Sequence, residues 1–240
     1  MSQPYPFFSF VIPAHNEEKY ISNTLKKLTE LEYPKNRYEV IVVENGSRDA
    51  TAKVVQEYCS ANERMYFLTS NPGVSNARNK GAGAIDISSD WVVFLDADTL
   101  VEAQFLTELA EFLEIRKDKN VSIGTTEIVP YLDTSFRARA WFKLYDFGHK
   151  YTQTSYSIQI CKSSVVRQIR YDENLRLAED LQYILDAKKF GTFFFFPTKT
   201  VSTSTRRFIE TGYWRLFFFW IFFGVMPHSI RKHIDYKVVR

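Results

Sequence analysis

Short apolar runs alternate with amphipathic segments along the first half of the chain. Continuous apolar runs are typical of strands buried on both faces, and apolar residues three or four apart indicate helices. The expected strands are residues 7–12, 40–43, 65–68 and 91–95. The expected helices are residues 17–31, 49–58, 75–87 and 102–116. This order predicts an α/β fold with a mostly parallel sheet flanked by helices.

The pattern is less regular in the second half. The expected strands there are residues 121–129, 157–161 and 192–196, and the expected helices are residues 136–150, 162–169 and 179–189. No internal repeat or low-complexity linker divides the chain. We therefore expect one domain over residues 1–210, in which residues 1–100 bind a cofactor-like ligand and residues 101–210 shape a pocket over it.

Two carboxylates follow the apolar run that ends at Leu95. Asp96 and Asp98 are two residues apart, and on an extended chain such side chains point the same way. Open α/β sheets bind ligands at this end of their strands, and carboxylate oxygens suit Mg²⁺ or Mn²⁺. The pair predicts a metal–diphosphate site, although the bare spacing is also common in ordinary turns.

Two loops leave the first and second strands at the same edge of the predicted sheet. The first runs from Pro13 to Glu18, and the second contains Glu44 and Asn45, which are candidates to bind a base or ribose. The structural alternative is that Asn45-Gly46 makes a turn and Ser47 caps the next helix.

Residues 73–81 open a helix that is rich in small residues. Glycine lets the backbone approach a ligand, and Arg78 near the helix start is a candidate to contact a base or phosphate. Tight packing of the helix on the sheet, with a solvated Arg78, would produce the same pattern.

Two further pairs of charged residues are candidates for chemistry. Glu179-Asp180 begins a helix, where it either complements the helix dipole or supplies a general base that deprotonates an attacking hydroxyl. Arg206-Arg207 either clamps a diphosphate through planar donors or forms a solvated or membrane-facing basic pair.

Charge and cysteine content narrow the function classes. The formal net charge is +3, with basic and acidic residues interleaved, so we expect no nucleic-acid partner. Cys59 and Cys161 lack metal-type spacing, and no apolar signal segment stands at the start, so we expect buried free thiols in a reduced, cytoplasmic compartment.

Residues 211–240 form an aromatic and basic C-terminal segment. Its uncharged part, residues 216–226, is shorter than the roughly twenty residues that a membrane-spanning helix needs. Arg206, Arg207 and Arg215 precede it and Arg231 and Lys232 follow it, which favours a helix lying peripherally on the cytoplasmic membrane face. The alternatives are a buried helix that covers the domain and a contact between two copies.

Taken together, these segments resemble the family 2 glycosyltransferases of the GT-A fold. The resemblance rests on residues 11–18, 42–51, 73–81, 94–98, 179–181 and 204–208, and it covers roughly residues 7–210. It implies an inverting transferase that uses a nucleotide-diphosphate sugar, a divalent metal, and a glycan or lipid-linked saccharide as acceptor. It also implies that residues 1–100 are the nucleotide-binding half and residues 101–210 the acceptor half.

The resemblance assigns roles to individual residues. Asp98, with Asp96, would bind the metal, and Asp180, beside Glu179, would be the catalytic base. Asp96 would also meet the ribose, Glu44 the nucleoside, and Arg78 the base or phosphates. The implied nucleotide-sugar site comprises Pro13, Ala14, Asn16, Glu17, Glu44, Asn45, Gly46, Arg78, Asp96, Ala97 and Arg207.

Two departures from the family pattern limit the substrate. Many members have two adjacent acids after the second strand, and the second often contacts uracil, but this chain has Glu44-Asn45. No Gln-x-x-Arg-Trp sequence is present, so processive polymer synthesis is not expected.

Two other functions compete with sugar transfer. A nucleotidyltransferase would favour a glycine-rich, basic loop after the first strand, whereas residues 13–18 are acidic. A catalytically silent, membrane-associated nucleotide- or glycan-binding protein would not need Glu179-Asp180 together with Asp96 and Asp98.

Overall fold

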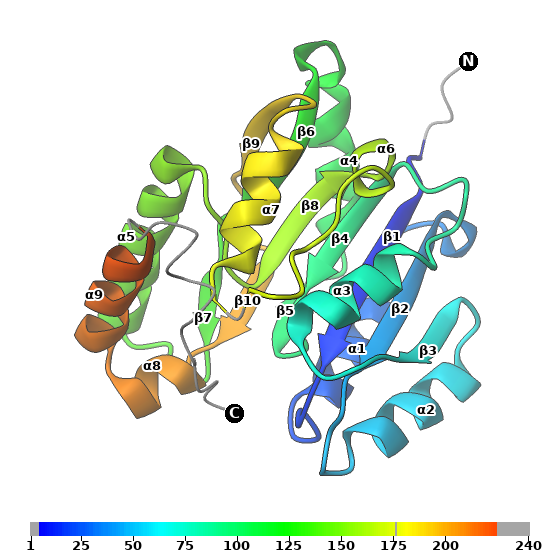
Figure 1. The fold of residues 1–240 in the computed structure, drawn as a ribbon, viewed down its shortest axis with the longest axis horizontal. Coiled ribbons are helices and arrows are strands. Elements are labelled where there is room, and N and C mark those ends of the chain that lie inside the picture. Colours follow the sequence, from blue (N-terminus) through cyan, green and yellow to red (C-terminus); the bar gives the residue numbers. More distant parts are fainter. Residues whose placement is uncertain (1–4, 176, 225–240) are drawn as a thin grey trace.

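The computed structural model describes residues 5–175 and 177–224. Its centre is a seven-stranded sheet with the order β3-β2-β1-β4-β8-β6-β9 (Figure 1). Only β8 among these strands runs antiparallel to its neighbours, β4 and β6. The predicted mostly parallel α/β sheet is confirmed. Its strands are β1 (Phe8–Ala14), β2 (Tyr38–Glu44), β3 (Met65–Thr69), β4 (Trp91–Leu95), β6 (Val121–Thr126), β8 (Ile158–Lys162) and β9 (Thr192–Phe196).

The strand order reverses direction at β1. β2 and β3 lie on one side of it, and β4 lies on the other side. At such a switch point the connections leave in opposite directions, and a crevice opens beyond the carboxyl ends of the strands. The segments that follow β1, β2 and β4 all border this crevice.

Helices cover both faces of the sheet (Figure 1). Alternate residues of β1 explain this, because Phe8, Phe10 and Ile12 pack with α1 and α4, whereas Val11 belongs to the opposite layer. The helices are α1 (Ile21–Thr29), α2 (Thr51–Ala61), α3 (Val74–Ala82), α4 (Phe105–Glu114), α5 (Phe136–Thr152), α6 (Ser163–Val166), α7 (Glu179–Ala187), α8 (Arg206–Thr211) and α9 (Tyr213–Gly224), with short 3-10 turns η1 (Lys35–Arg37) and η2 (Lys117–Lys119).

Helix α3 lies very close to the sheet, as its small residues predict. A Cβ atom on Gly81 would stand 2.4 Å from Val11 Cγ1 and 3.2 Å from Val43 Cγ2. Any larger residue there would push the helix outward. Because α3 also carries Arg78, this close packing fixes where that side chain enters the crevice.

A second sheet of three short strands, with the order β5-β10-β7, was not predicted. The expected strand 121–129 is in fact two strands, β6 and β7 (Val129–Tyr131), which belong to different sheets. β5 (Thr99–Val101) and β10 (Val201–Ser204) are too short to show an apolar period. Pairing between β5 and β10 brings the residue before β5, Asp98, close to the segment that follows β10.

Local polar contacts correct the expected start of α2. The helix begins at Thr51, whose backbone N–H donates to Asp49 Oδ1 at 3.0 Å. The alternative in which Ser47 caps this helix does not hold, because its Oγ accepts a hydrogen bond from the Asn16 backbone N–H at 3.0 Å. The serine therefore joins the loops after β1 and β2 and does not cap a helix.

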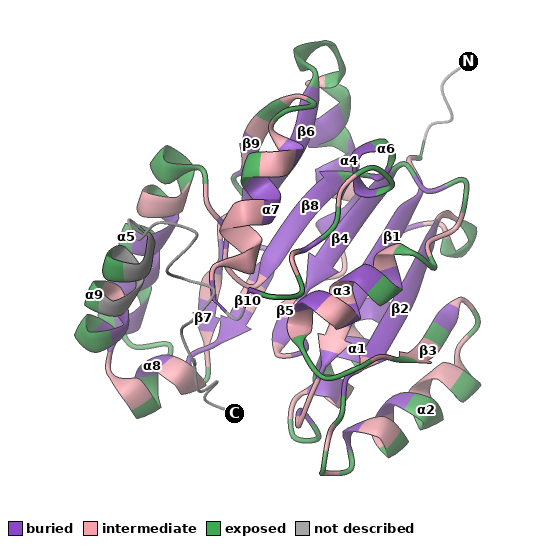
Figure 2. Cartoon of the chain, viewed as in Figure 1, coloured by how far each residue is buried: buried purple, intermediate pink, exposed green. Residues whose placement is uncertain are grey.

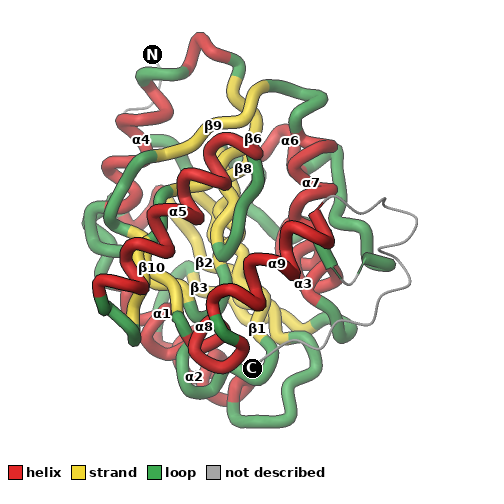
Figure 3. Tube along the Cα trace, turned by 90° about the vertical axis from the view of Figure 1, so that its left-hand side faces the viewer, coloured by secondary structure: helices red, strands yellow, loops and turns green. Residues whose placement is uncertain are grey.

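Helix α9 packs along α5 on one side of the molecule, which faces the viewer in Figure 3. The Trp141 ring on α5 lies 5.6 Å from the Tyr213 ring and 5.7 Å from the Phe217 ring. None of the helices that the structure describes is long and apolar enough to cross a membrane. Residues 225–240 of the expected C-terminal segment lie outside the described residues.

Candidate active site

A cavity of about 350 Å³ lies at the switch point of the sheet. Its lining comes from the ends of β1, β2 and β4, from the segment before β8, and from the starts of α7 and α8. Because β8 is antiparallel, its beginning lies at the same edge as the ends of its parallel neighbours. The predicted residues in the lining are Pro13, Glu17, Asn45, Arg78, Asp96, Ala97, Asp98, Glu179, Asp180 and Arg207.

Four other predicted residues do not line this cavity. Ala14 is buried inside the sheet, and Asn16 Oδ1 accepts the Arg48 backbone N–H at 2.8 Å. Glu44 Oε1 accepts the Ser47 backbone N–H, within the turn that contains Gly46. Asn16 thus joins the two loops from which Glu17 and Asn45 reach the cavity, and Glu44 closes the turn within the second loop.

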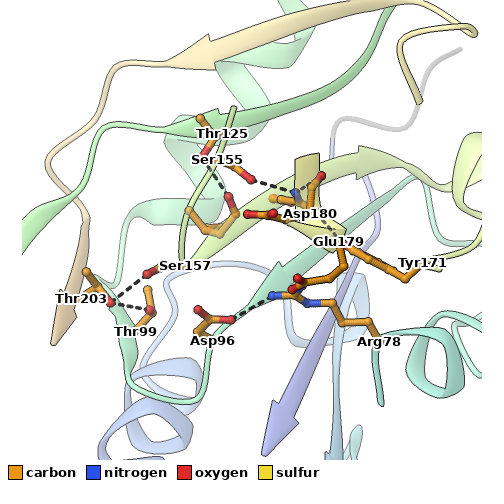
Figure 4. A network of polar contacts seen from close by, with 12 residues as sticks. Arg78, Asp96, Thr99, Thr125, Ser155, Ser157, Tyr171, Glu179, Asp180 and Thr203 are labelled. Carbon is orange, nitrogen blue, oxygen red and sulfur yellow. Dashed lines mark hydrogen bonds and ion pairs between the residues drawn. The ribbon is translucent and has the colours of Figure 1, made fainter. Parts of the chain in front are cut away.

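Arg78 connects two walls of the cavity (Figure 4). Its Nη2 lies 3.2 Å from Asp96 Oδ1, and its Nη1 lies 3.0 Å from Glu179 Oε1. The guanidinium also lies over the Tyr171 ring, 5.1 Å from the centroid. Arg78 and Glu179 side chains are only 11% and 14% exposed, so this ion pair is largely shielded from water.

Asp96 and Asp98 lie in a turn. The Thr99 backbone N–H donates to the Asp96 carbonyl at 3.0 Å, so the extended geometry assumed from the sequence was wrong. As a result the two carboxylates pair with different arginines, and Asp98 Oδ2 lies 3.0 Å from Arg206 Nη2. Both carboxylates still border the same cavity.

Arg206 bridges Asp98 to Glu17, whose Oε1 lies 2.6 Å from the same Nη2 atom. Burial raises the pKa of Asp98 to about 7, and the charges of Asp96 and Glu17 add to this while Arg206 and Arg207 oppose it. Glu17 Oε2 is buried and has no hydrogen-bond partner among the described residues. The cluster of Glu17, Asp98 and Arg206 thus contains carboxylate oxygens that Arg206 does not pair.

Asp180 lies in the first turn of α7 and makes no ion pair with the described residues. Its Oδ1 accepts the Leu181 backbone N–H at 2.8 Å. Burial, together with the adjacent Glu179 charge, raises the pKa of Asp180 to about 7, and the Arg78 charge opposes this rise. The preceding Ala178 adopts a left-handed conformation with φ of 58°, which is unfavourable for alanine. Such local strain is often found at functional sites, and here it sets the direction in which α7 starts.

Several lining residues were not predicted. They include His15, the stretch from Thr154 to Ser157, and Thr203. Thr203 Oγ1 lies 2.9 Å from Thr99 Oγ1 and 3.1 Å from Ser157 Oγ, and the second contact joins the small sheet to the segment that precedes β8 (Figure 4). Isolated serines and threonines have no sequence signal. Arg206 was noticed only as half of a basic pair, and its partner Glu17 is 189 positions away.

The same carboxylates are the candidate ligands for a metal ion. Among the described residues, no group of three or more His, Cys, Asp or Glu side chains is arranged to hold a metal ion by itself. Asp96 and Asp98 do supply hard oxygen donors beside a crowded negative cluster, which fits Mg²⁺ or Mn²⁺ if a ligand and water complete the shell.

Curated proteins similar to this chain are glycosyltransferases. Glycosyltransferase AglE of Haloferax volcanii is 32% identical over 106 residues, which cover 44% of this chain and 35% of that protein. Poly(ribitol-phosphate) beta-N-acetylglucosaminyltransferase TarS of Staphylococcus aureus is 30% identical over 108 residues, covering 45% of this chain and 19% of that protein. The chain thus matches about a third or less of the length of these relatives.

Solved structures show the same fold. S. aureus TarS 1-349 in complex with UDP-GlcNAc has a TM-score of 0.66 at 19% identity, over 83% of this chain and 59% of that one. The mannosyltransferase PcManGT from Pyrobaculum calidifontis, in complex with GDP-Man and Mn²⁺, has a TM-score of 0.63 at 19% identity, over 84% of this chain and 58% of that one. The fold is the expected GT-A type.

The family itself is settled by a sequence profile that matches most of the domain. The profile described as Glycosyl transferase family 2 covers residues 9–175, from β1 through β8 and beyond. This chain belongs to glycosyl transferase family 2.

Proposed function

We propose that this chain is an inverting glycosyltransferase. It would move a sugar from a nucleotide-diphosphate sugar to a hydroxyl of a glycan or lipid-linked saccharide. The observation that carries the proposal is that one cavity contains both Asp180, whose carboxyl has a pKa near neutral, and the Asp96–Asp98 turn with its arginines. The first can activate an acceptor, and the second can hold a departing diphosphate.

Asp180 is proposed to act as general base. A carboxyl with a pKa of about 7 is partly ionised at neutral pH and is still basic enough to accept a proton. The acceptor oxygen forms a bond to the anomeric carbon and transfers its proton to Asp180. The bond from that carbon to the diphosphate oxygen breaks, and attack opposite the leaving group inverts the configuration.

Arginines and carboxylates would receive the leaving group. Arg207 lines the cavity and makes no hydrogen bond or ion pair with the described residues, so its guanidinium is available for diphosphate oxygens. Asp96 and Asp98 would hold a divalent cation, which supplies positive charge for the diphosphate as it departs. The Mn²⁺ that accompanies GDP-Man in the PcManGT structure supports this assignment by analogy.

The proposed nucleotide end of the cavity contains buried polar atoms that have no hydrogen-bond partner among the described residues. They are Asn45 Oδ1 and Arg78 Nε. Buried polar atoms are nearly always paired, so these two atoms favour a bound ligand with its own donors and acceptors. Pro13, Glu17 and Ala97 complete this end, while Ala14, Asn16, Glu44 and Gly46 would act by shaping the loops behind it.

A donor panel tests the proposal. Nucleotide-diphosphate sugars are added with Mg²⁺ or Mn²⁺, and the melting temperature and the release of nucleoside diphosphate are both measured. We expect at least one donor to raise the melting temperature in a metal-dependent manner, because a ligand that prefers the folded state stabilises it. A panel in which no donor has any effect would contradict the proposal.

The variant Asp180→Asn separates catalysis from binding. It should keep the donor-induced rise in melting temperature and lose turnover by roughly 10³-fold, within the range of general-base contributions. Asp118→Asn, at an exposed position in η2, serves as the matched control and should behave like the wild type. Unchanged turnover in Asp180→Asn would remove the base assignment and favour a binding protein. Pyrophosphate release from a nucleoside triphosphate and a sugar phosphate would favour nucleotidyl transfer.

A further inference from the structure

Helices α5 and α9 expose two stripes of large apolar side chains. On α5 the stripe repeats at helical spacing and begins at Phe136, which is 88% exposed. On α9 the exposed side chains are four residues apart, and Phe218 is 63% exposed. We call this surface the aromatic face, and it consists of Phe136, Leu144, Phe147, Tyr151, Trp214, Phe218 and Phe222.

The two stripes belong to one surface. Trp141 of α5 lies beneath them and packs its ring 4.8 Å from the ring of Trp214, which in turn lies 6.3 Å from the Phe218 ring. Figure 2 shows the buried sides of α5 and α9 turned toward each other and toward the sheet, and their exposed sides turned outward. Contiguous exposed aromatic surface of this kind usually marks an interaction site.

Every exposed charged side chain described on α5 and α9 is basic. Arg139, Lys143 and Lys150 are spaced four and seven residues apart, so they follow one border of the α5 stripe. These three side chains and Arg215 on α9 make no hydrogen bond or ion pair with the described residues. The only acidic residue in the two helices, Asp146, is buried beneath the face.

We propose that the aromatic face docks this protein onto an anionic membrane surface. A stripe of aromatic and aliphatic residues bordered by lysine and arginine is the pattern of helices that lie in the headgroup region. The basic border complements anionic lipid headgroups, whereas a contact between two copies would bring basic borders together.

The face adjoins the cavity. His149 lies on α5 between Phe147 and Tyr151, and it lines the cavity together with Arg207 and Phe208 of α8. Docking would therefore place one side of the cavity beside the headgroups, which suits a lipid-linked acceptor. That consequence rests on the proposed function, but the docking itself does not.

Co-sedimentation of the full chain with vesicles tests the docking. Vesicles of phosphatidylcholine mixed with phosphatidylglycerol are compared with vesicles of phosphatidylcholine alone. We expect the wild type to pellet with the anionic vesicles and to bind more weakly as salt is raised. A wild type that stays in the supernatant with the anionic vesicles overturns the proposal.

Two double variants, each with a matched control, distinguish the two parts of the face. Arg139→Glu with Lys143→Glu should lower the partition coefficient by more than tenfold, since each basic residue at an anionic surface contributes a roughly fivefold effect. Lys119→Glu with Lys199→Glu, at exposed positions outside α5 and α9, should leave it unchanged. Phe136→Ser with Phe147→Ser should reduce binding, while Ile87→Ser with Ile115→Ser, equally exposed elsewhere, should not.

Melting temperature and oligomeric state are measured for each variant. Because the substituted side chains are exposed, we expect all variants to melt like the wild type. Wild-type vesicle binding by both face variants would overturn the proposal. A second outcome would also overturn it: the wild type does not bind vesicles, and light scattering shows a dimer. The double variant Phe136→Ser with Phe147→Ser would then be monomeric. The face would then be an interface between two copies.

Discussion

Two walls of the cavity carry buried aspartates in different electrostatic surroundings. On the wall formed by the turn after β4, Asp96 and Asp98 each pair with a guanidinium, from Arg78 and Arg206 respectively. On the wall formed by α7, Asp180 makes no ion pair with the described residues, and its Oδ1 accepts the Leu181 backbone N–H. Burial raises the pKa of both Asp98 and Asp180 to about 7.

The difference suits the two walls to different chemistry. A carboxylate that is paired with arginines can exchange partners when a ligand brings its own charges, because the pairing costs little to rearrange within a cluster. Asp180 lines the cavity and makes no ion pair with the described residues, so an acceptor hydroxyl can approach its carboxyl without displacing a guanidinium. The first arrangement is suited to holding a diphosphate with its cation, and the second to accepting a proton from an attacking hydroxyl.

Removing Arg78 should have the largest effect on stability, because both walls lose the guanidinium that they share. Arg78→Met leaves Glu179 and Asp96 near each other without their shared guanidinium, and we expect the free energy of unfolding to fall by about 3 kcal/mol. This is the low end for a broken buried pair because the Asp96 side chain is 37% exposed. Urea unfolding at neutral pH measures it. Arg48→Met, at an exposed position in the loop before α2, is the control that should leave stability unchanged.

The pH dependence of the difference in stability between the wild type and Asp180→Asn should isolate Asp180, because Asp98 titrates in both proteins. The pKa of Asp180 is 3.8 before folding and about 7 afterwards, so the folded state holds a proton that the unfolded state has lost between about pH 4 and pH 7. Wild-type stability should therefore fall across this window as pH rises, and the loss should be complete above it.

Asp180→Asn does not titrate there. It should match the wild type below pH 4 and exceed it at pH 8 by roughly 2 kcal/mol, less than the full shift implies because Glu179 shares the charge. Thermal unfolding from pH 4 to pH 8 measures the difference. A constant difference between the two proteins at all pH values would show that Asp180 is not perturbed.

Arg207 offers the finest separation of ligand binding from folding. Arg207→Gln should change the free energy of unfolding by no more than about 0.5 kcal/mol, because the side chain makes no hydrogen bond or ion pair with the described residues. Affinity for a nucleoside diphosphate should fall by about tenfold, the cost of one charged hydrogen bond. Titration calorimetry of both proteins is the measurement. An unchanged affinity would confine diphosphate binding to the arginines that are already paired.

The elements that could be predicted from the sequence are those whose burial produces a local pattern of apolar or small residues. β1, β2 and β4 are covered on both faces, so they appear as uninterrupted apolar runs, and the small residues of α3 predicted its close approach to the sheet. The ends of elements were harder to place, because they depend on individual hydrogen bonds such as that between Asp49 and Thr51.

Features that depend on distant partners could not be predicted. β5, β7 and β10 have three or four residues each and exist because they pair with one another across the chain. The Asp96–Asp98 spacing indicated a shared cavity, but the turn at Asp96 and the separate arginines followed only from the structure. The exposed stripe of α5 was also missed, because the sequence predicted a helix there without indicating which of its apolar side chains face solvent.

The connections made by Arg78 and Arg206 also have a consequence for how the protein folds. Arg78 meets Glu179 across 101 positions, and Arg206 meets Glu17 across 189. Contacts between such distant residues form late, because the intervening chain must first be ordered. As the chain emerges from the ribosome, β1 to β4 can pair while their charged loops still lack partners. The site is therefore completed only when α7 and α8 arrive, and a nascent or truncated chain would have most of its sheet without an assembled site.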